Sequence, residues 1–232
     1  MSKLFNYLAL LLIVLPFTSC QEKKSEANVP KWILSMVSDS KNTSAEADFS
    51  NILSDKSVPY IGYIGTDYQK FSIDIQKVQR IDDNQYDVSG ITIVKNNRCN
   101  FRGTIDIVEN REFTHPTYGV DDSMKGQFRR RGCSIAKYNL EETSQTGSGV
   151  FTGYLLFYWY ETNDGKFVYD DIDSHSDSYC NNQYAGTWKS NKTKKSKPCA
   201  WGQYRVLNSG DLDVGAGEFS VNPKYAKNGW GK

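Results

Sequence analysis

The chain has 232 residues, and its 28 Lys and Arg residues stand against 27 Asp and Glu residues, which gives a formal net charge of +1 at pH 7. Such a balanced charge provides no global attraction to a polyanion, so we expect no nucleic-acid partner. The length suits one folded domain with short appendages.

The first 19 residues have the layout of a secretory signal peptide. Lys3 supplies a positive start, residues 8–17 (LALLLIVLPF) form an apolar core, and small residues directly precede Cys20. The apolar core is shorter than the roughly 20 residues that a membrane-spanning helix needs. We therefore predict a leader over residues 1–19, with a membrane-anchoring helix as the alternative.

Phe17-Thr18-Ser19-Cys20 resembles a bacterial lipobox, with Phe17 at the position where Leu is usual. The resemblance implies that Cys20 carries acyl chains such as palmitate and becomes the mature N-terminus. The next residues, QEKKSE, resemble the charged export signals of surface lipoproteins of the Bacteroidota. Together these resemblances imply an exported protein that is lipid-anchored to the outer membrane. Exposure at the cell surface and a position facing the periplasm are the two alternatives for its orientation.

Loss of the leader removes Lys3 and no acidic residue, which leaves 27 basic against 27 acidic residues. Residues 21–30 (QEKKSEANVP) are polar and end in Pro, so residues 20–30 are predicted to be a lipidated cysteine followed by a flexible tether. A single β-rich domain is predicted for residues 31–232.

Residues 31–55 carry the helical signals of the chain. Thr43 and Glu46 have capping-box spacing. The apolar residues that then fall on one helical face are Phe49, Ile52 and Leu53. The preceding KWILSMV fits either a first helix or an edge strand.

From residue 60 onward the hydrophobic pattern has a period of two. The strand candidates are KFSIDIQKV, QYDVSGITIVK, NFRGTIDIVEN, GVFTGYLLFYWYE, KFVYDDI, AGTWKS and GQYRVL. Turn signals separate them, and Asn163-Asp164-Gly165 is the strongest hairpin signal. About seven or eight such strands, with one or two short N-terminal helices, predict a mainly antiparallel β-barrel or β-sandwich.

The segment VFTGYLLFYWY is apolar on both alternating faces, so we predict a central strand that is covered on both sides or lines a ligand cavity. Phe101-Arg-Gly103 and Phe151-Thr-Gly153 share a pattern in which a strand glycine permits a bend or the close approach of an aromatic ring. With Gly186-Thr-Trp188 these motifs are similar to those of lipocalin-like barrels. A lipocalin carries its G-x-W on the first strand, however, so no family is assigned.

The chain has five cysteines, an odd number, and lipidation of Cys20 would leave four. In an exported protein these four predict two disulfides. Three connectivities are possible, and we favour the sequential one, which joins Cys99 to Cys133 and Cys180 to Cys199. Zinc binding is the alternative, but no cysteine pair has C-x-x-C spacing and the chain has only two histidines.

Two acidic segments are candidate sites. Residues 169–179 (YDDIDSHSDSY) could hold a structural calcium ion, although the EF-hand pattern is not met and a solvated acidic loop is the alternative. The candidate metal ligands are Asp171, Asp173 and Asp177. No other cofactor is expected, and His175 has no accompanying nucleophile motif.

Residues 209–219 (SGDLDVGAGEF) combine carboxylates with three glycines. The carboxylates could form a pair of the kind used in glycoside hydrolysis, or an ion site, while Asp and Gly together also build ordinary turns. The residues concerned are Asp211, Asp213 and Glu218.

Basic residues cluster twice, and they either bind an anionic partner, such as a polysaccharide or an acidic protein face, or are solvated loop charges. The first cluster is Arg129-Arg130-Arg131. The second comprises Lys189, Lys192, Lys194, Lys195 and Lys197.

The sequence contains no catalytic constellation, so we expect a non-enzymatic binding module that is presented at the cell envelope to a protein or glycan. One alternative is an envelope glycan hydrolase that uses Asp211, Asp213 or Glu218. The other is a lipocalin-like carrier whose cavity would be lined by Phe157 and Trp159.

Overall fold

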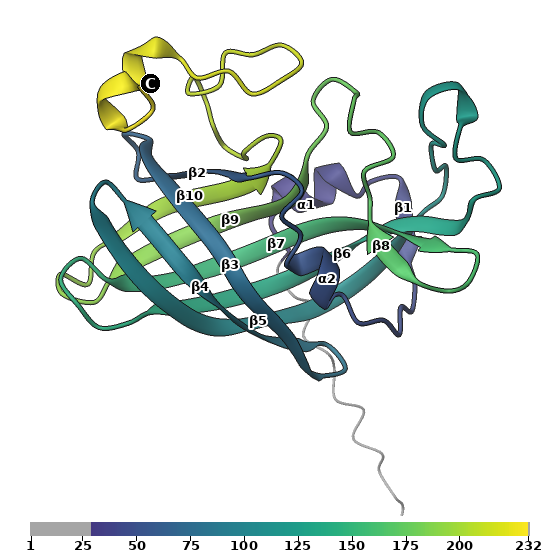
Figure 1. Cartoon of the computed structure of the whole chain (residues 1–232), viewed down its shortest axis with the longest axis horizontal. Coiled ribbons are helices and arrows are strands. Elements are labelled where there is room, and N and C mark those ends of the chain that lie inside the picture. Colours follow the sequence, from purple (N-terminus) through teal and green to yellow (C-terminus); the bar gives the residue numbers. More distant parts are fainter. Residues whose placement is uncertain (1–28, 232) are drawn as a thin grey trace, which may run out of the picture.

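The computed structural model of the chain describes residues 29–231 (Figure 1). The predicted leader, Cys20 and the tether up to residue 28 lie outside the described residues. Among residues 29–231, none of the helices has the length and apolar character that crossing a membrane requires.

The described chain contains ten strands and four short helical segments. In chain order they are α1 (Lys31–Met36), β1 (Ser40–Asn42), α2 (Ser50–Leu53), β2 (Tyr60–Ile64), β3 (Gln69–Asp82), β4 (Gln85–Val94), β5 (Asn97–Phe113), η1 (Val120–Asp122), β6 (Phe128–Glu142), β7 (Gly149–Thr162), β8 (Phe167–Tyr169), β9 (Asn181–Ser190), β10 (Ser196–Gln203) and η2 (Pro223–Asn228). This content confirms the prediction of a mainly antiparallel β protein with short N-terminal helices.

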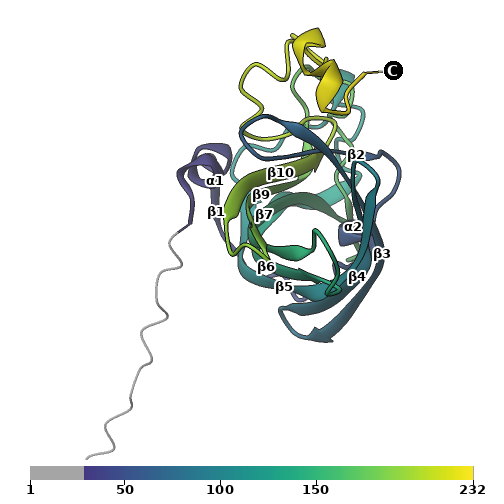
Figure 2. The ribbon, with the colours of Figure 1, turned by 90° about the vertical axis from the view of Figure 1, so that its left-hand side faces the viewer.

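Eight strands pair into a continuous antiparallel ring, which Figure 2 shows end-on. The ring follows chain order through β2, β3, β4, β5, β6, β7, β9 and β10, and β10 pairs back with β2. Its shortest link is between β2 and β3, where only Tyr63 and Ile64 pair with residues of β3. β1 and β8 extend the sheet by pairing with β5 and β7.

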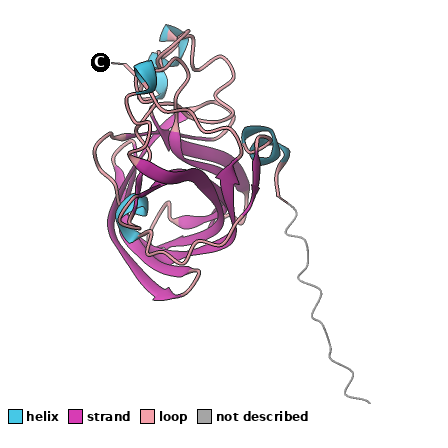
Figure 3. Ribbon diagram, turned by 90° about the vertical axis from the view of Figure 1, so that its right-hand side faces the viewer, coloured by secondary structure: helices cyan, strands magenta, loops and turns pink. Residues whose placement is uncertain are grey.

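Successive strands run in opposite directions, so the connections alternate between the two ends of the ring. The turn end carries the connections at residues 65–68, 95–96, 143–148 and 191–195. The loop end carries those at residues 83–84, 114–127 and 163–180 and the segment after residue 203 (Figure 3). These two ends differ in chemistry, as described below.

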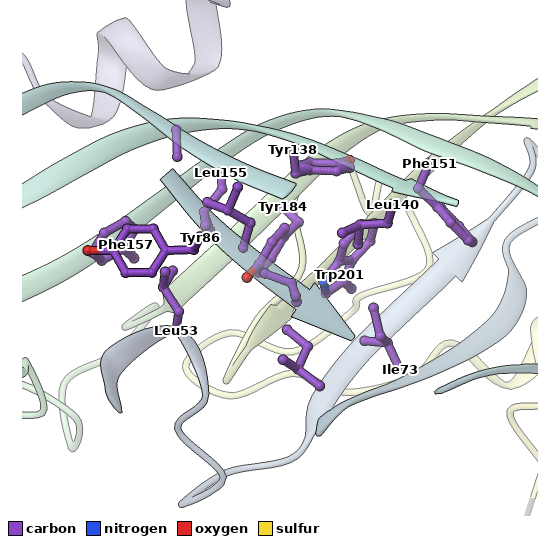
Figure 4. Packing of buried hydrophobic residues seen from close by; sticks show 14 of the residues in the cluster. Leu53, Ile73, Tyr86, Tyr138, Leu140, Phe151, Leu155, Phe157, Tyr184 and Trp201 are labelled. Carbon is purple, nitrogen blue, oxygen red and sulfur yellow. The ribbon is translucent and has the colours of Figure 1, made fainter. Parts of the chain in front are cut away.

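Large apolar side chains pack inside the ring (Figure 4). Tyr184 and Trp201 stack with their ring centroids 4.7 Å apart, and Tyr138 meets Trp201 edge-on at 5.1 Å. At the loop end, α2 directs Phe49 into the ring, 5.3 Å from the ring of Phe157. The interior is therefore a packed aromatic core.

Strand β7 is central, as its sequence predicts. Phe157 and Trp159 belong to the interior cluster, whereas Leu156 on the opposite face packs against Ile33 and Val37 of the α1 region. Both faces of the strand are covered, which explains why both alternating sets of side chains are apolar.

A glycine pair permits one close contact in the ring. Gly153 of β7 lies opposite Gly186 of β9, and the Tyr138 side chain lies against this pair. A Cβ atom at Gly153 would lie 2.6 Å from the Tyr138 hydroxyl oxygen and 2.3 Å from the Ala185 carbonyl oxygen. The F-x-G pattern at this position thus reflects a close approach, as expected for a strand glycine.

The C-terminal segment packs over the outer face of β2, β9 and β10, where its apolar residues join Tyr63 and Ala200 in a cluster. Tyr225 contacts Tyr68 with ring centroids 5.2 Å apart, and Trp230 Nε1 donates to the Tyr68 carbonyl at 2.7 Å. The tail is thus packed over the barrel by Tyr225 and Trp230.

Some local predictions are confirmed and others are wrong. The hairpin at Asn163-Asp164-Gly165 joins β7 to β8 as predicted. The capping box is wrong, because α2 begins at Ser50 and its amide donates to Asp48 Oδ1 at 2.9 Å. The strand at residues 128–142 is absent from the sequence-based prediction. Both faces of residues 131–136 are buried, so this stretch has no alternation, whereas residues 137–142 alternate between exposed and buried positions.

The predicted disulfides are also wrong, because all four described cysteines are free. Cys133 lies opposite Arg111, twelve residues along β5 from Cys99, a separation of about 40 Å at the usual strand rise. Cys199 lies opposite Gly186, six residues from Cys180, or about 20 Å. Disulfide formation needs Cα atoms within roughly 7 Å, so the strand register forbids both pairings.

The segment between Cys180 and Cys199 is consequently not a disulfide-closed loop. It forms the β9–β10 hairpin, with its turn at residues 191–195. Because the other four cysteines are free, the odd number of cysteines no longer singles out Cys20. Its predicted lipidation now rests on the leader and lipobox sequence alone.

We predict that the native protein reacts slowly with thiol reagents. Burial raises the pKa of Cys133 and Cys199 to about 12 and that of Cys180 to about 11, and it also raises the pKa of Cys99. In a chain carrying Cys20→Ser, four thiols should react after unfolding without reductant. A count of two or none under those conditions would contradict the strand register.

Candidate binding site at the loop end

A buried ion pair organises the loop end of the ring. The Arg131 side chain from β6 is 8% exposed, and that of Asp170, which follows β8, is fully buried. Arg131 Nε lies 2.5 Å from Asp170 Oδ2, and Arg131 Nη1 lies 2.6 Å from Asp173 Oδ2. The Thr117 hydroxyl donates to the same Asp173 oxygen at 2.6 Å. One guanidinium thereby connects β6 to two loops.

The protonation behaviour of these groups reflects burial opposed by ion pairing. Burial raises the pKa of Asp170 above its ordinary value, although the Arg131 charge acts in the opposite direction. Burial would also raise the pKa of Asp173, but hydrogen bonds from Thr117 and Arg131 outweigh it, and the pKa is lowered. Burial disfavours the Arg131 charge, yet the two carboxylates raise its pKa overall. The arginine is therefore charged at any physiological pH.

Hydrogen bonds from the Asn181 side chain to main-chain groups fix the end of the 163–180 loop to β7. Asn181 Nδ2 donates to the carbonyls of Tyr158 and Asp170, at 3.2 Å each, and Asn181 Oδ1 accepts from the Tyr158 amide at 2.8 Å. The Tyr179 hydroxyl also donates to the Asp170 carbonyl. The stretch from Asp170 to Asn181 is thus held at both of its ends.

Between this loop, the 114–127 loop and α1 lies a hollow of about 370 Å³. Its lining residues are Met36, Phe113, His115, Pro116, Thr117, Arg131, Tyr158, Asp170, Asp173, Ser178, Tyr179 and Cys180. The Phe113 and Tyr158 rings are 6.0 Å apart. Apolar walls with a few fixed polar groups are typical of ligand-binding sites.

The polar groups that line this hollow differ in whether they are already held in buried ion pairs. Arg131 and Asp173 are already ion-paired, whereas His115 at the exposed rim contacts only Thr114 and Asp39, with Nδ1 3.0 Å from Asp39 Oδ1. Burial raises the pKa of Tyr158, so its hydroxyl stays protonated and can donate. The hollow offers an apolar surface with hydrogen-bonding groups at its edge.

A second hollow, of about 410 Å³, lies on the other side of the 163–180 loop. Tyr179 belongs to both hollows, and its ring meets Tyr204 edge-on at 4.8 Å. His175 and Glu218 also line this second hollow.

The predicted calcium ligands do not converge. Asp173 is engaged by Arg131, and Asp177 lies beside the backbone of Gly217 in a different part of the loop. Asp171 is exposed. Within residues 29–231 no group of three or more His, Cys, Asp or Glu side chains could hold a metal ion.

The three carboxylates of residues 209–219 have separate environments. Asp213 Oδ2 lies 2.6 Å from Arg205 Nη2, and its other oxygen accepts from two backbone amides. Asp211 instead binds Lys224 and the Tyr225 hydroxyl, which lower its pKa. Only Glu218 lines a hollow. Arg205 further donates to the carbonyls of residues 215–217, so this segment is a loop built around one arginine.

The two predicted basic clusters lie in different places and differ in pairing. Arg129 and Arg130 both pair with Glu161, at 3.4 and 2.5 Å, and Arg131 pairs as described. This arginine run is internally neutralised and forms no open basic surface. The lysine cluster lies at the opposite, turn end of the ring.

A larger polar groove, of about 820 Å³, lies between residues 42–46 and the β3–β4 turn. Most of its charged groups are paired locally, since Arg80 pairs with Asp83 and Glu109 pairs with Arg111. Glu46 also lines the groove, where it is exposed and takes part in no ion pair among residues 29–231. The smaller hollow beside Arg131 therefore remains the better candidate site.

Several residues of this site carry no recognisable sequence signal. Met36, Phe113 and Tyr158 come from three distant elements and read as ordinary apolar or aromatic positions. The acidic residues of segment 169–179 marked the loop in the sequence. No sequence pattern, however, linked that loop to Arg131 of β6. Comparison of the chain with protein-family models, curated proteins and solved structures gave no match.

We predict that Asp170→Asn lowers the free energy of unfolding by about 3–5 kcal/mol, because it leaves the buried guanidinium without its closest counter-charge. The matched control is Asp74→Asn, which disrupts the exposed pair with Lys56 and should have little effect. Chemical denaturation of both variants measures the difference. Equal, small effects would show that the ion pair does not organise the loop end.

Proposed function

We propose that the chain is a lipid-anchored envelope protein whose β-domain is a non-enzymatic binding module. The observation that carries the proposal is the hollow beside Arg131, which combines apolar walls with polar groups that the fold has already oriented. Preorganised groups of this kind reduce the entropic cost of binding.

The chemistry of the hollow favours a protein partner over a glycan. Its walls include Met36, Phe113 and Pro116, and the half-buried Tyr158 packs its ring against that of Phe113. A volume of about 370 Å³ suits one large apolar side chain with its flanking backbone. His115 and Ser178 at the hollow can hydrogen-bond that backbone.

The two alternative functions, a glycan hydrolase and a small-ligand carrier, have less structural support. A glycan hydrolase needs one carboxyl with a raised pKa and a second within reach, whereas Asp211 and Asp213 are each held by their own cation. A carrier needs a lumen, whereas Phe157 and Trp159 pack against Phe49. The binding-module hypothesis needs neither feature.

We predict that Met36→Ser and His115→Ala each weaken capture of an envelope protein by roughly tenfold, as expected for residues central to an interface. Crosslinking of the full chain to envelope fractions, followed by titration of the captured partner, provides the measurement. Leu34→Ser on the exposed side of α1 and His175→Ala in the second hollow are matched controls. If the controls weaken capture as much, or if no variant does, the hollow is not the site.

The anchor is tested separately. We expect metabolic lipid label on the full-length chain and none on Cys20→Ser, because only the thiol at that position accepts the acyl-bearing group. Protease treatment of intact cells then reports whether the labelled domain faces outward. Label that persists in Cys20→Ser would refute the anchor without affecting the binding hypothesis.

A further inference from the structure

The turn end of the ring carries a cluster of unpaired lysines. All of them lie in the β9–β10 hairpin, are exposed, and take part in no ion pair among residues 29–231: Lys189, Lys192, Lys194, Lys195 and Lys197. Between Asp177 and Asp211 the sequence contains no acidic residue. The hairpin therefore has no internal counter-charge.

Neighbouring turns increase this charge. The β4–β5 turn contributes the exposed Lys95 and Arg98 to the same end. The exposed acidic residues there are Asp67 and Glu141. Glu142 is buried, where it accepts hydrogen bonds from the Gly149 amide and Trp188 Nε1. A chain that is neutral overall thus has a strongly basic end.

The form of this end limits what it can bind. The lysines are exposed on the hairpin, and none of them lines the hollows described above. Trp188, the aromatic residue nearest to these lysines in the sequence, packs against the interior cluster and donates a hydrogen bond to Glu142, so it offers no stacking platform for a sugar. Lysine ammonium groups are hydrated point charges without the fixed geometry that recognises a defined ligand. These features fit a diffuse negative surface.

We propose that the turn end docks on an anionic lipid surface through the β9–β10 hairpin. Each lysine near such a surface strengthens binding, and the effect decays within a Debye length. This inference concerns a different surface from the loop-end hollow and goes beyond the proposed function.

The same geometry assigns an orientation. With the turn end on the membrane, the barrel stands upright and the loop-end hollow faces away from the lipid. Residues 21–28 are the eight residues between Cys20 and the described chain, and they can span less than about 30 Å. The electrostatic contact of the turn end does not depend on that anchor.

The test compares binding of the full chain to vesicles of phosphatidylcholine alone and of phosphatidylcholine mixed with phosphatidylglycerol. Every protein carries Cys20→Ser, so no acyl chain contributes and the N-terminal segment acts equally in all of them. We expect stronger binding to the anionic vesicles, and loss of the preference when the Debye length falls from about 10 Å at 0.1 M to about 3 Å at 1 M salt.

Lys192→Gln, Lys194→Gln and Lys195→Gln combined should reduce binding to the anionic vesicles by roughly tenfold or more. The matched control combines Lys31→Gln, Lys77→Gln and Lys137→Gln, which removes the same charge from exposed positions that lie outside the turn end and take part in no ion pair among residues 29–231. Equal loss in both triple variants would overturn the proposal, because net charge alone would then explain it. Equal binding of the parent protein to the two kinds of vesicle would also overturn the proposal. This holds even if the protein binds a soluble polyanion such as polyphosphate, because the proposed ligand is an anionic lipid surface.

Discussion

The guanidinium of Arg131 and the carboxylate of Asp170 are both removed from water, and each depends on the other for its charge to be tolerated. Because Arg131 lies in β6 and Asp170 follows β8, their pairing determines where the 163–180 loop leaves the ring. Thr117 and Asp173 extend the network to the 114–127 loop. The walls of the candidate hollow are therefore positioned by one ionic cluster, and Arg205 serves the same purpose for the glycine-rich segment that follows β10.

The ring provides the rigid base that such a cluster needs. Stacked aromatic side chains, such as Tyr184 on Trp201, fill its interior, and α1 covers the outer face of β7 through Ile33 and Val37. Close packing on both faces keeps the strands in one register. That register also separates the cysteines, so the stability of the domain comes from packing, strand pairing and ion pairs.

The alternation of connections around an antiparallel ring gives the molecule two chemically distinct ends. The loop end pairs its charges, as in Arg130 with Glu161, and retains an apolar hollow. The turn end leaves the hairpin lysines without counter-charges. Under the proposed function and the proposed membrane docking, one end would meet a charged surface while the other would remain free for a partner.

The sequence by itself determined the β character, because period-two patterns such as Phe71, Ile73 and Ile75 and the turn at Asn163-Asp164-Gly165 are local signals. It also marked the acidic run, the glycine-rich segment and the lysine cluster, since composition is visible without a fold. Only the tertiary structure decided which charges meet. The partner of Arg131 lies 39 residues away, and whether two cysteines can pair depends on strand register, which no local pattern encodes. Long-range pairing is a property of the closed ring, and for that reason the site and the free thiols emerged only with the fold.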